Sequence, residues 1–175
     1  MRWCWIDRFV EFHSDSRAKA VKNVSLAEPY LRGHFPRRPV MPNSLIVEGM
    51  GQTGMYLACE AINYSEMILP AKVLSARFHC EAVPGDALTY TVSIDSIQDQ
   101  GVSVSAFSHN GDRLQGEANL LYARLADRSP DGRGGDLPAM ARQMRLPGVF
   151  EIGTAADGSR LQPPAMLARS GVKNA

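Results

Sequence analysis

Strand-like segments lie on both sides of one long apolar stretch of this chain, and in two of them, residues 87–97 and 102–108, apolar and polar side chains alternate. A period of two is typical of strands with one buried face. The strand-like segments are residues 5–12, 18–25, 72–82, 87–97, 102–108 and 113–125. Turn-forming residues separate them, and the strongest turn signal is the Asn110-Gly111 pair. The pattern predicts two strands, followed further along the chain by four more.

The apolar stretch between these groups, residues 45–62, predicts a buried helix because it is apolar on nearly every side. Pro42 and the prolines before it exclude an earlier start, and Asn43 and Ser44 are both expected as N-caps. A long helix against an antiparallel sheet is an α+β arrangement. We interpret the helix glycines as places where the sheet packs closely: Gly49, Gly51 and Gly54.

Composition narrows the classes of protein that fit. With 175 residues and 45% hydrophobic residues, the chain can bury a sizeable core. A net charge of +1 argues against a nucleic-acid partner. The three cysteines cannot all pair, which fits a reducing compartment. The most apolar segment carries acidic residues and the N-terminus does not read as a signal peptide, so we expect no membrane span and a cytoplasmic protein.

The composition changes near residue 127, where the sequence SPDGRGGDLP is rich in turn formers. We therefore divide the chain into a folded domain, residues 1–126, and a Gly/Pro/Arg-rich C-terminal extension, residues 127–175. Within the extension, the pattern suggests a short helix at 139–145 and a weak strand at 148–152.

Several chemically useful groups lie close together around the helix start. Glu48 and Gln52 are one helical turn apart and share a face, and the first backbone N–H groups near Asn43 lack helical acceptors. His34 lies just upstream. A base, an acid and an oxyanion site suit proton removal beside a carbonyl. A structural interpretation stays open, in which His34 is a surface residue and Glu48 pairs with a nearby arginine.

The segment GHFPRRPVMPNSLIVEGMGQTG resembles the signature of β-hydroxyacyl-acyl carrier protein dehydratases of the hot-dog fold. The resemblance covers about residues 1–125. Two positions depart from the family pattern, since Arg37 and Asn43 stand where glycines are usual. At the family's acid position this sequence has Glu48, whereas the related isomerising branch carries an aspartate, so the resemblance implies the non-isomerising branch. The matching residues are His34, Phe35, Pro36, Pro39, Val40, Met41, Pro42, Glu48 and Gln52.

The resemblance implies a sheet wrapped around a central helix, in a homodimer, or three such dimers together, with each active site shared between two chains. His34 is then expected to remove the α-proton, and Glu48 of the other chain to protonate the departing hydroxyl. The N–H of Asn43 is expected to bind the enolate oxygen and Gln52 to orient Glu48. No cofactor or metal is implied, and the substrate is carried on acyl carrier protein.

Arg37 and Arg38 are candidates for docking the acidic carrier protein, although each could equally be an ordinary solvated charge. Two other functions remain open, because one fold can support different chemistries. One is a hot-dog acyl-CoA thioesterase, and the other is a non-catalytic module that binds an acyl chain or carrier protein. The pairing of His34 with Glu48 around three prolines favours dehydration.

Overall fold

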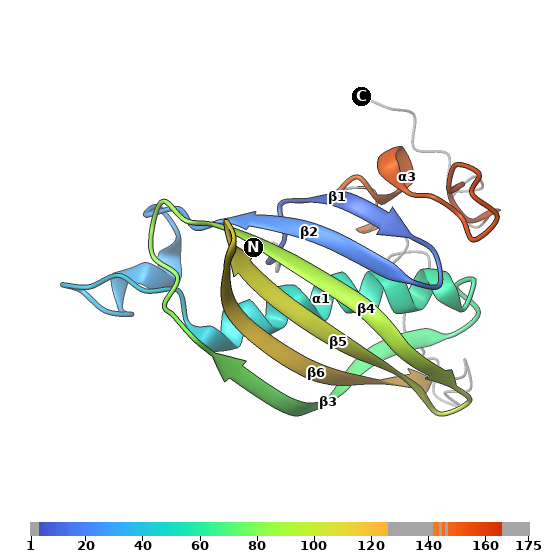
Figure 1. The fold of residues 1–175 in the computed structure, drawn as a ribbon, viewed down its shortest axis with the longest axis horizontal. Helices are drawn as coiled ribbons and strands as arrows, with labels where there is room; N and C mark the ends of the chain where they lie inside the picture. Colours follow the sequence, from blue (N-terminus) through green and yellow to red (C-terminus); the bar gives the residue numbers. More distant parts are fainter. Residues whose placement is uncertain (1–3, 126–141, 144, 146, 166–175) are drawn as a thin grey trace, which may run out of the picture.

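A computed structural model of the chain describes residues 4–125, 142–143, 145 and 147–165. Within them, a six-stranded sheet has a long helix lying along one face (Figure 1). The strands are β1 (Arg8–His13), β2 (Arg17–Asn23), β3 (Met67–Phe78), β4 (Ala87–Gln98), β5 (Gly101–Asn110) and β6 (Arg113–Leu125). The helical elements are η1 (Pro29–Arg32), α1 (Asn43–Ala61) and α3 (Val149–Ile152). The α+β class and the order of two strands, one helix and four strands are confirmed.

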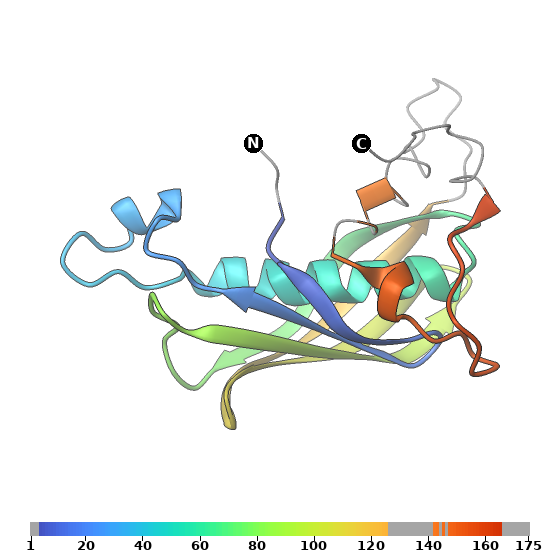
Figure 2. The same cartoon turned by 90° about the horizontal axis from the view of Figure 1, so that it is seen from above.

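The sheet is antiparallel, in the order β1-β2-β4-β5-β6-β3. The central meander β4-β5-β6 turns sharply at Asn110-Gly111, where Gly111 has a φ of 59° and Asn110 pairs with Arg113. The predicted hairpin is therefore confirmed. Strand β3 follows α1 in sequence and joins the far side of β6, so the chain crosses the concave face before it completes the sheet (Figure 2).

Helix α1 lies close to the sheet because glycines face two aromatic rings. A Cβ added at Gly49 would lie 2.4 Å from Cε2 of Tyr90, and one at Gly54 would lie 2.5 Å from the hydroxyl oxygen of Tyr122. Both tyrosines are fully buried. Close packing is thus confirmed at these two positions. At Gly51 an added Cβ would meet nothing within 4 Å, so Gly51 borders open space instead.

The start of α1 differs from the prediction. Pro42 is the N-cap, Asn43 is the first helical residue, and no side chain caps this end. The carbonyl of Pro42 accepts from the N–H groups of Leu45 and Ile46, at 2.9 and 3.3 Å. The predicted caps were therefore wrong, because the extended proline already supplies the first acceptor. No helix in the described residues is both long and apolar enough to cross a membrane.

Two other elements differ in extent or type. Strand β3 begins at Met67 rather than near residue 72, because a sheet edge tolerates Pro70. Residues 149–152 form helix α3, so the predicted strand at 148–152 is wrong. Helix α3 begins directly after Gly148, whose φ of 80° is a backbone conformation that favours glycine. The helix predicted at 139–145 lies mostly outside the described residues.

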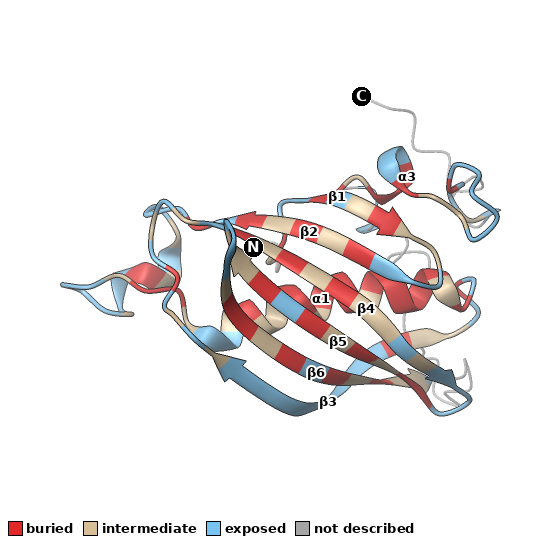
Figure 3. Cartoon of the chain, viewed as in Figure 1, coloured by how far each residue is buried: buried red, intermediate tan, exposed pale blue. Residues whose placement is uncertain are grey.

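The two edges of the sheet are treated differently. Part of the C-terminal extension lies along β1, where the N–H of Phe9 donates to the carbonyl of Pro147 at 2.7 Å and that of Thr154 donates to Phe12 at 2.8 Å. Val149 and Leu161 are buried there. Along β3, by contrast, most residues are exposed (Figure 3). The division of the chain at residue 126 stays a prediction, but residues 147–161 pack on the sheet.

The glycine contacts predict opposite effects of one substitution at two helix positions. We expect Gly49→Ala to lower the free energy of unfolding, because overpacking costs about 1–3 kcal/mol and the gain in helix propensity is only about 1 kcal/mol. Gly51→Ala should raise it by up to about 1 kcal/mol. Urea unfolding measures both changes in the free energy of unfolding, provided that the variants keep the m-value of the wild type. Equal effects of the two substitutions would contradict this packing.

Candidate active site

His34 lies in a lobe, residues 33–41, that projects beyond the end of the sheet (Figures 1 and 2). Backbone bonds close this lobe tightly. The Val40 N–H donates to the His34 carbonyl at 2.9 Å, and Phe35 and Arg38 exchange two bonds, of 3.1 and 3.0 Å. Met41 then donates to the carbonyl of Ala82 at 2.8 Å. The lobe is therefore a closed turn that holds His34 in one position.

The imidazole of His34 has a defined tautomer. Its Nδ1 lies 2.9 Å from the Val40 carbonyl oxygen, and a carbonyl can only accept. In the neutral ring, Nδ1 therefore carries the proton and Nε2 keeps the lone pair. The ring also stacks on Phe35, with centroids 4.3 Å apart. His34 is thus oriented so that Nε2 can act as a base.

The carboxylate of Glu48 is held by Gln52 in the predicted one-turn contact. The Gln52 Nε2 donates to Oε1 of Glu48 at 2.9 Å. The side-chain amide oxygen of Gln52, Oε1, accepts from the backbone N–H of Trp5 at 2.8 Å. Because Trp5 can only donate there, the amide cannot flip, and its NH₂ must face Glu48. Trp5 could not have been identified from the sequence, since it acts through its backbone.

Glu48 borders two adjoining cavities, of about 190 and 290 Å³. Both are also lined by Gly51 and Pro70. The smaller one extends under β3 and β6 towards Val73. The larger one follows α1 towards Met55. His34 lines neither cavity, so a single chain does not bring the predicted base and acid together in them.

Neutral tyrosines stand beside the carboxylate. The hydroxyl of Tyr122 donates to the Gly51 carbonyl at 2.8 Å. Burial raises the pKa of Tyr122, and the neighbouring Cys59 and Glu48 raise it further. Burial also raises the pKa of Tyr56, which lines the larger cavity. Both side chains therefore stay protonated at neutral pH and add no charge near Glu48.

The first turn of α1 is open to an oxygen ligand. Asn43 and Ser44 are exposed, and the first turn contains no acidic residue. Their backbone N–H groups have no acceptor within the helix. Positive φ among the non-glycine described residues is confined to Asp15, Asn63 and Tyr64. Neither Asn43 nor Arg37 thus needs the left-handed backbone that would explain a glycine at these positions.

Exposed arginines surround the lobe. Arg37 is exposed, and Arg38 pairs with Glu81 across the surface. An exposed pair of this kind contributes little to stability. Arg32, at the end of η1, is also exposed and was not singled out from the sequence. It adds a third positive side chain, two residues before His34 in the sequence.

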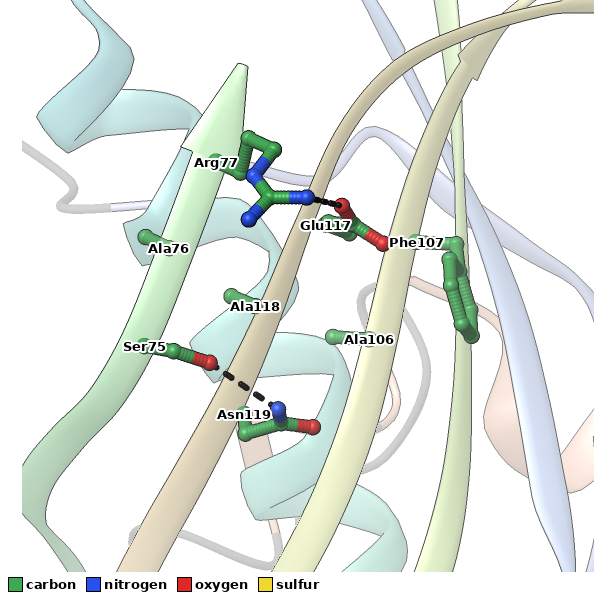
Figure 4. Close-up of a pocket in the computed structure, with 8 residues that line it drawn as sticks. All are labelled: Ser75, Ala76, Arg77, Ala106, Phe107, Glu117, Ala118 and Asn119. Carbon is green, nitrogen blue, oxygen red and sulfur yellow. Dashed lines mark hydrogen bonds and ion pairs between the residues drawn. The ribbon is translucent and has the colours of Figure 1, made fainter.

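A further hollow of about 340 Å³ lies on the opposite face of the sheet from α1 (Figure 4). Polar side chains that line it form hydrogen bonds and ion pairs with one another across neighbouring strands. Asn119 donates to Ser75 at 2.9 Å, and Arg77 faces Glu117 at 3.8 Å. These are cross-strand pairs of an exposed sheet. In the described part of the chain, no group of three or more His, Cys, Asp or Glu side chains is placed to bind a metal.

Comparison with known proteins gives a consistent result. A family model described as a FabA-like domain matches residues 3–113. The 3-hydroxyacyl-[acyl-carrier-protein] dehydratase FabZ of Verminephrobacter eiseniae is 33% identical over 130 residues, which covers 72% of this chain and 87% of that one. The same-named protein of a Roseiflexus species is 38% identical over 120 residues, covering 67% and 83%.

Solved structures share the fold at low sequence identity. S. sahachiroi AziG superposes with a TM-score of 0.56 at 15% identity, covering 68% of this chain and 90% of that chain. The conserved protein PA5202 from Pseudomonas aeruginosa gives a TM-score of 0.55 at 15% identity, covering 67% and 87%.

The contact between Gln52 and Glu48 predicts a pH-dependent stability change. Gln52→Leu removes both hydrogen bonds described above and should lower the free energy of unfolding by about 1–3 kcal/mol. Gln52→Glu can still accept from Trp5, but it places a second carboxylate beside Glu48. Like charges raise a carboxyl pKa in the folded state, so folding takes up a proton. The loss of stability should therefore be largest at neutral pH and shrink as the pH falls.

Urea unfolding of both variants at neutral and mildly acidic pH measures this effect. Gln98→Glu, at an exposed position on β4, is the charge-matched control. A stability loss in Gln52→Glu that does not change with pH would show that the two side chains do not interact.

Proposed function

The chain belongs to the FabA-like family, and from that premise we propose that it dehydrates β-hydroxyacyl thioesters on acyl carrier protein to trans-2-enoyl thioesters in fatty acid biosynthesis. The observation that carries the proposal is the setting of Glu48. Its carboxylate is oriented by Gln52 and borders cavities with largely apolar walls. A proton donor at the end of an apolar pocket suits a substrate whose reacting carbons continue into an acyl chain.

The proposed chemistry needs three groups. The Nε2 lone pair of His34 takes the α-proton, and the electrons of that C–H bond form the new double bond. The N–H of Asn43, supported by the helix dipole, holds the thioester oxygen while negative charge develops on it. Glu48 gives its proton to the β-hydroxyl, the C–O bond breaks, and water leaves. Gln52 acts as a positioning residue for Glu48.

We further propose that the base and the acid come from different chains of a homodimer. Strand β3 has an open edge in the described structure, with Leu69, Val73 and Leu74 exposed at 42%, 49% and 53%. A long exposed edge with apolar side chains favours pairing with another strand. Val73 and Pro70 also line the smaller Glu48 cavity. A second copy paired along β3 would therefore adjoin Glu48 directly. Assembly of three such dimers stays a prediction.

Docking of the carrier protein is proposed at the His34 lobe. Carrier proteins are acidic, and the lobe exposes Arg37 and Arg38 beside His34. Electrostatic complementarity of this kind mainly affects encounter and orientation. Arg37 is the better candidate, since Arg38 already pairs with Glu81.

Mixing two inactive variants tests the proposed shared site. We expect His34→Ala and Glu48→Gln each to lower kcat for dehydration by about 10²–10⁴-fold. A one-to-one mixture, unfolded and refolded together, should recover about a quarter of the wild-type activity, because random pairing leaves one intact composite site in each mixed dimer. Formation of the conjugated enoyl group is followed by absorbance.

The outcomes separate the competing functions. Recovery in the mixture supports a site shared between chains, whereas two inactive variants without recovery would place both groups in one chain. Release of free thiol without enoyl formation by the wild-type protein would indicate a thioesterase. Binding without turnover would indicate a non-catalytic module.

A charge reversal tests docking. Arg37→Glu should raise KM for a substrate on acyl carrier protein while leaving KM for the same acyl group on pantetheine unchanged, because only the former brings an acidic surface. Arg160→Glu, at an exposed position in the C-terminal extension, is the charge-matched control. Equal effects of Arg37→Glu on both substrates would exclude a docking role.

A further inference from the structure

One wall of the larger Glu48 cavity comes from the C-terminal extension. Gln143, whose side chain is exposed, lines this cavity of about 290 Å³ together with Glu48, Met55, Tyr56 and Pro70. The match to the FabA-like family model ends at residue 113. The residue at this wall is therefore supplied by a part of the chain that lies outside the family match.

The segment around Gln143 is tied to the sheet. The N–H of Arg145 donates to the carbonyl of Arg142 at 3.2 Å, and that of Gly148 donates to Arg145 at 3.1 Å. Four residues after Gln143, the Pro147 carbonyl accepts from the N–H of Phe9 in β1 at 2.7 Å. These contacts connect the position of Gln143 to the edge strand.

Helix α3 and the residues after it strengthen this attachment. Val149 is fully buried and Phe150 is nearly so. Figure 1 shows α3 beside β1. The N–H of Ser14 donates to the carbonyl of Thr154 at 2.9 Å. The extension is thus anchored to the β1 edge by both apolar burial and backbone bonds.

The cavity follows α1 away from the proposed acid. From Glu48 to Met55 the helix advances about 10 Å, at about 1.5 Å per residue. Gly51 leaves room along this path, since an added Cβ there would meet nothing within 4 Å. Met55 and Pro70 add apolar walls. This shape suits an acyl chain whose reacting end lies at Glu48.

We propose that Gln143 is a specificity-determining residue that limits the length of the acyl chain this site accepts. The inference rests on the proposed dehydratase function. Methylene groups placed against an amide displace its water without replacing the lost hydrogen bonds, which is unfavourable. The cavity is also near the lower end, about 300 Å³, of ordinary ligand pockets. Chains long enough to reach Gln143 are therefore disfavoured, while shorter ones do not contact it.

Two substitutions separate volume from polarity. Gln143→Ala removes both the bulk and the amide, and Gln143→Met keeps the length of the side chain but makes it apolar. We expect Gln143→Ala to raise kcat/KM for long-chain relative to short-chain β-hydroxyacyl thioesters by about tenfold, the discrimination typical of a changed apolar pocket. Gln143→Met should raise it less. The change should lie mainly in KM for long chains, with short-chain kcat retained.

Gln162→Ala is the matched control, because Gln162 is an exposed glutamine of the same extension that bonds to the carbonyl of Arg160. Short-, medium- and long-chain pantetheine substrates are assayed in parallel with each full-length variant. An unchanged chain-length profile in both Gln143 variants, with the wild type active, would overturn the inference alone. A wild type that dehydrates no substrate would overturn the proposed function, and this inference with it. Circular dichroism and urea unfolding confirm that each variant is folded.

Discussion

The rings of Tyr90 and Tyr122 occupy the space that side chains at positions 49 and 54 of α1 would need. This close approach sets the depth at which the helix lies on the sheet, and with it the placement of every group on the other helix faces. The hydroxyl of Tyr122 also bonds to the carbonyl of Gly51. Glu48 is therefore held at a set distance from β3 and β6, and the hollow beside Gly51 remains open. A bulkier helix face would push α1 outwards and change the shape of the candidate site.

The two edges of the sheet differ in how far the rest of the chain covers them. At β1 the chain's own extension supplies backbone partners and buried apolar side chains. At β3 the described residues supply neither, and the strand that lines the Glu48 cavity is the exposed one. In the proposed homodimer, the open β3 edge would pair with a second copy and the extension would cover the β1 edge, so only one edge would be available for pairing.

The secondary structure of the C-terminal extension could not be predicted from its sequence pattern. Its composition is rich in turn formers, and the sequence suggested a weak strand at 148–152. Instead Val149 and Phe150 lie on a short helix that packs against β1. A polar segment with only a few apolar residues has no periodicity from which their packing partner could be predicted. The structure shows that these residues cover the edge strand β1. Gln143 is similar, since nothing in its neighbourhood along the chain connects it with Glu48.

The sequence by itself determined the class of fold, the strands and the central helix, because a period of two and an apolar run both follow from which side chains face a core. It also determined that Gln52 meets Glu48, since residues four apart on a helix are neighbours. The tertiary structure alone decided which amide orientation Gln52 adopts, because the Trp5 N–H comes from a distant segment. It also decided that Pro42 rather than Asn43 caps α1, and that His34 and Glu48 of one chain do not line the same cavities. These depend on contacts between segments far apart in sequence, which local periodicity does not encode.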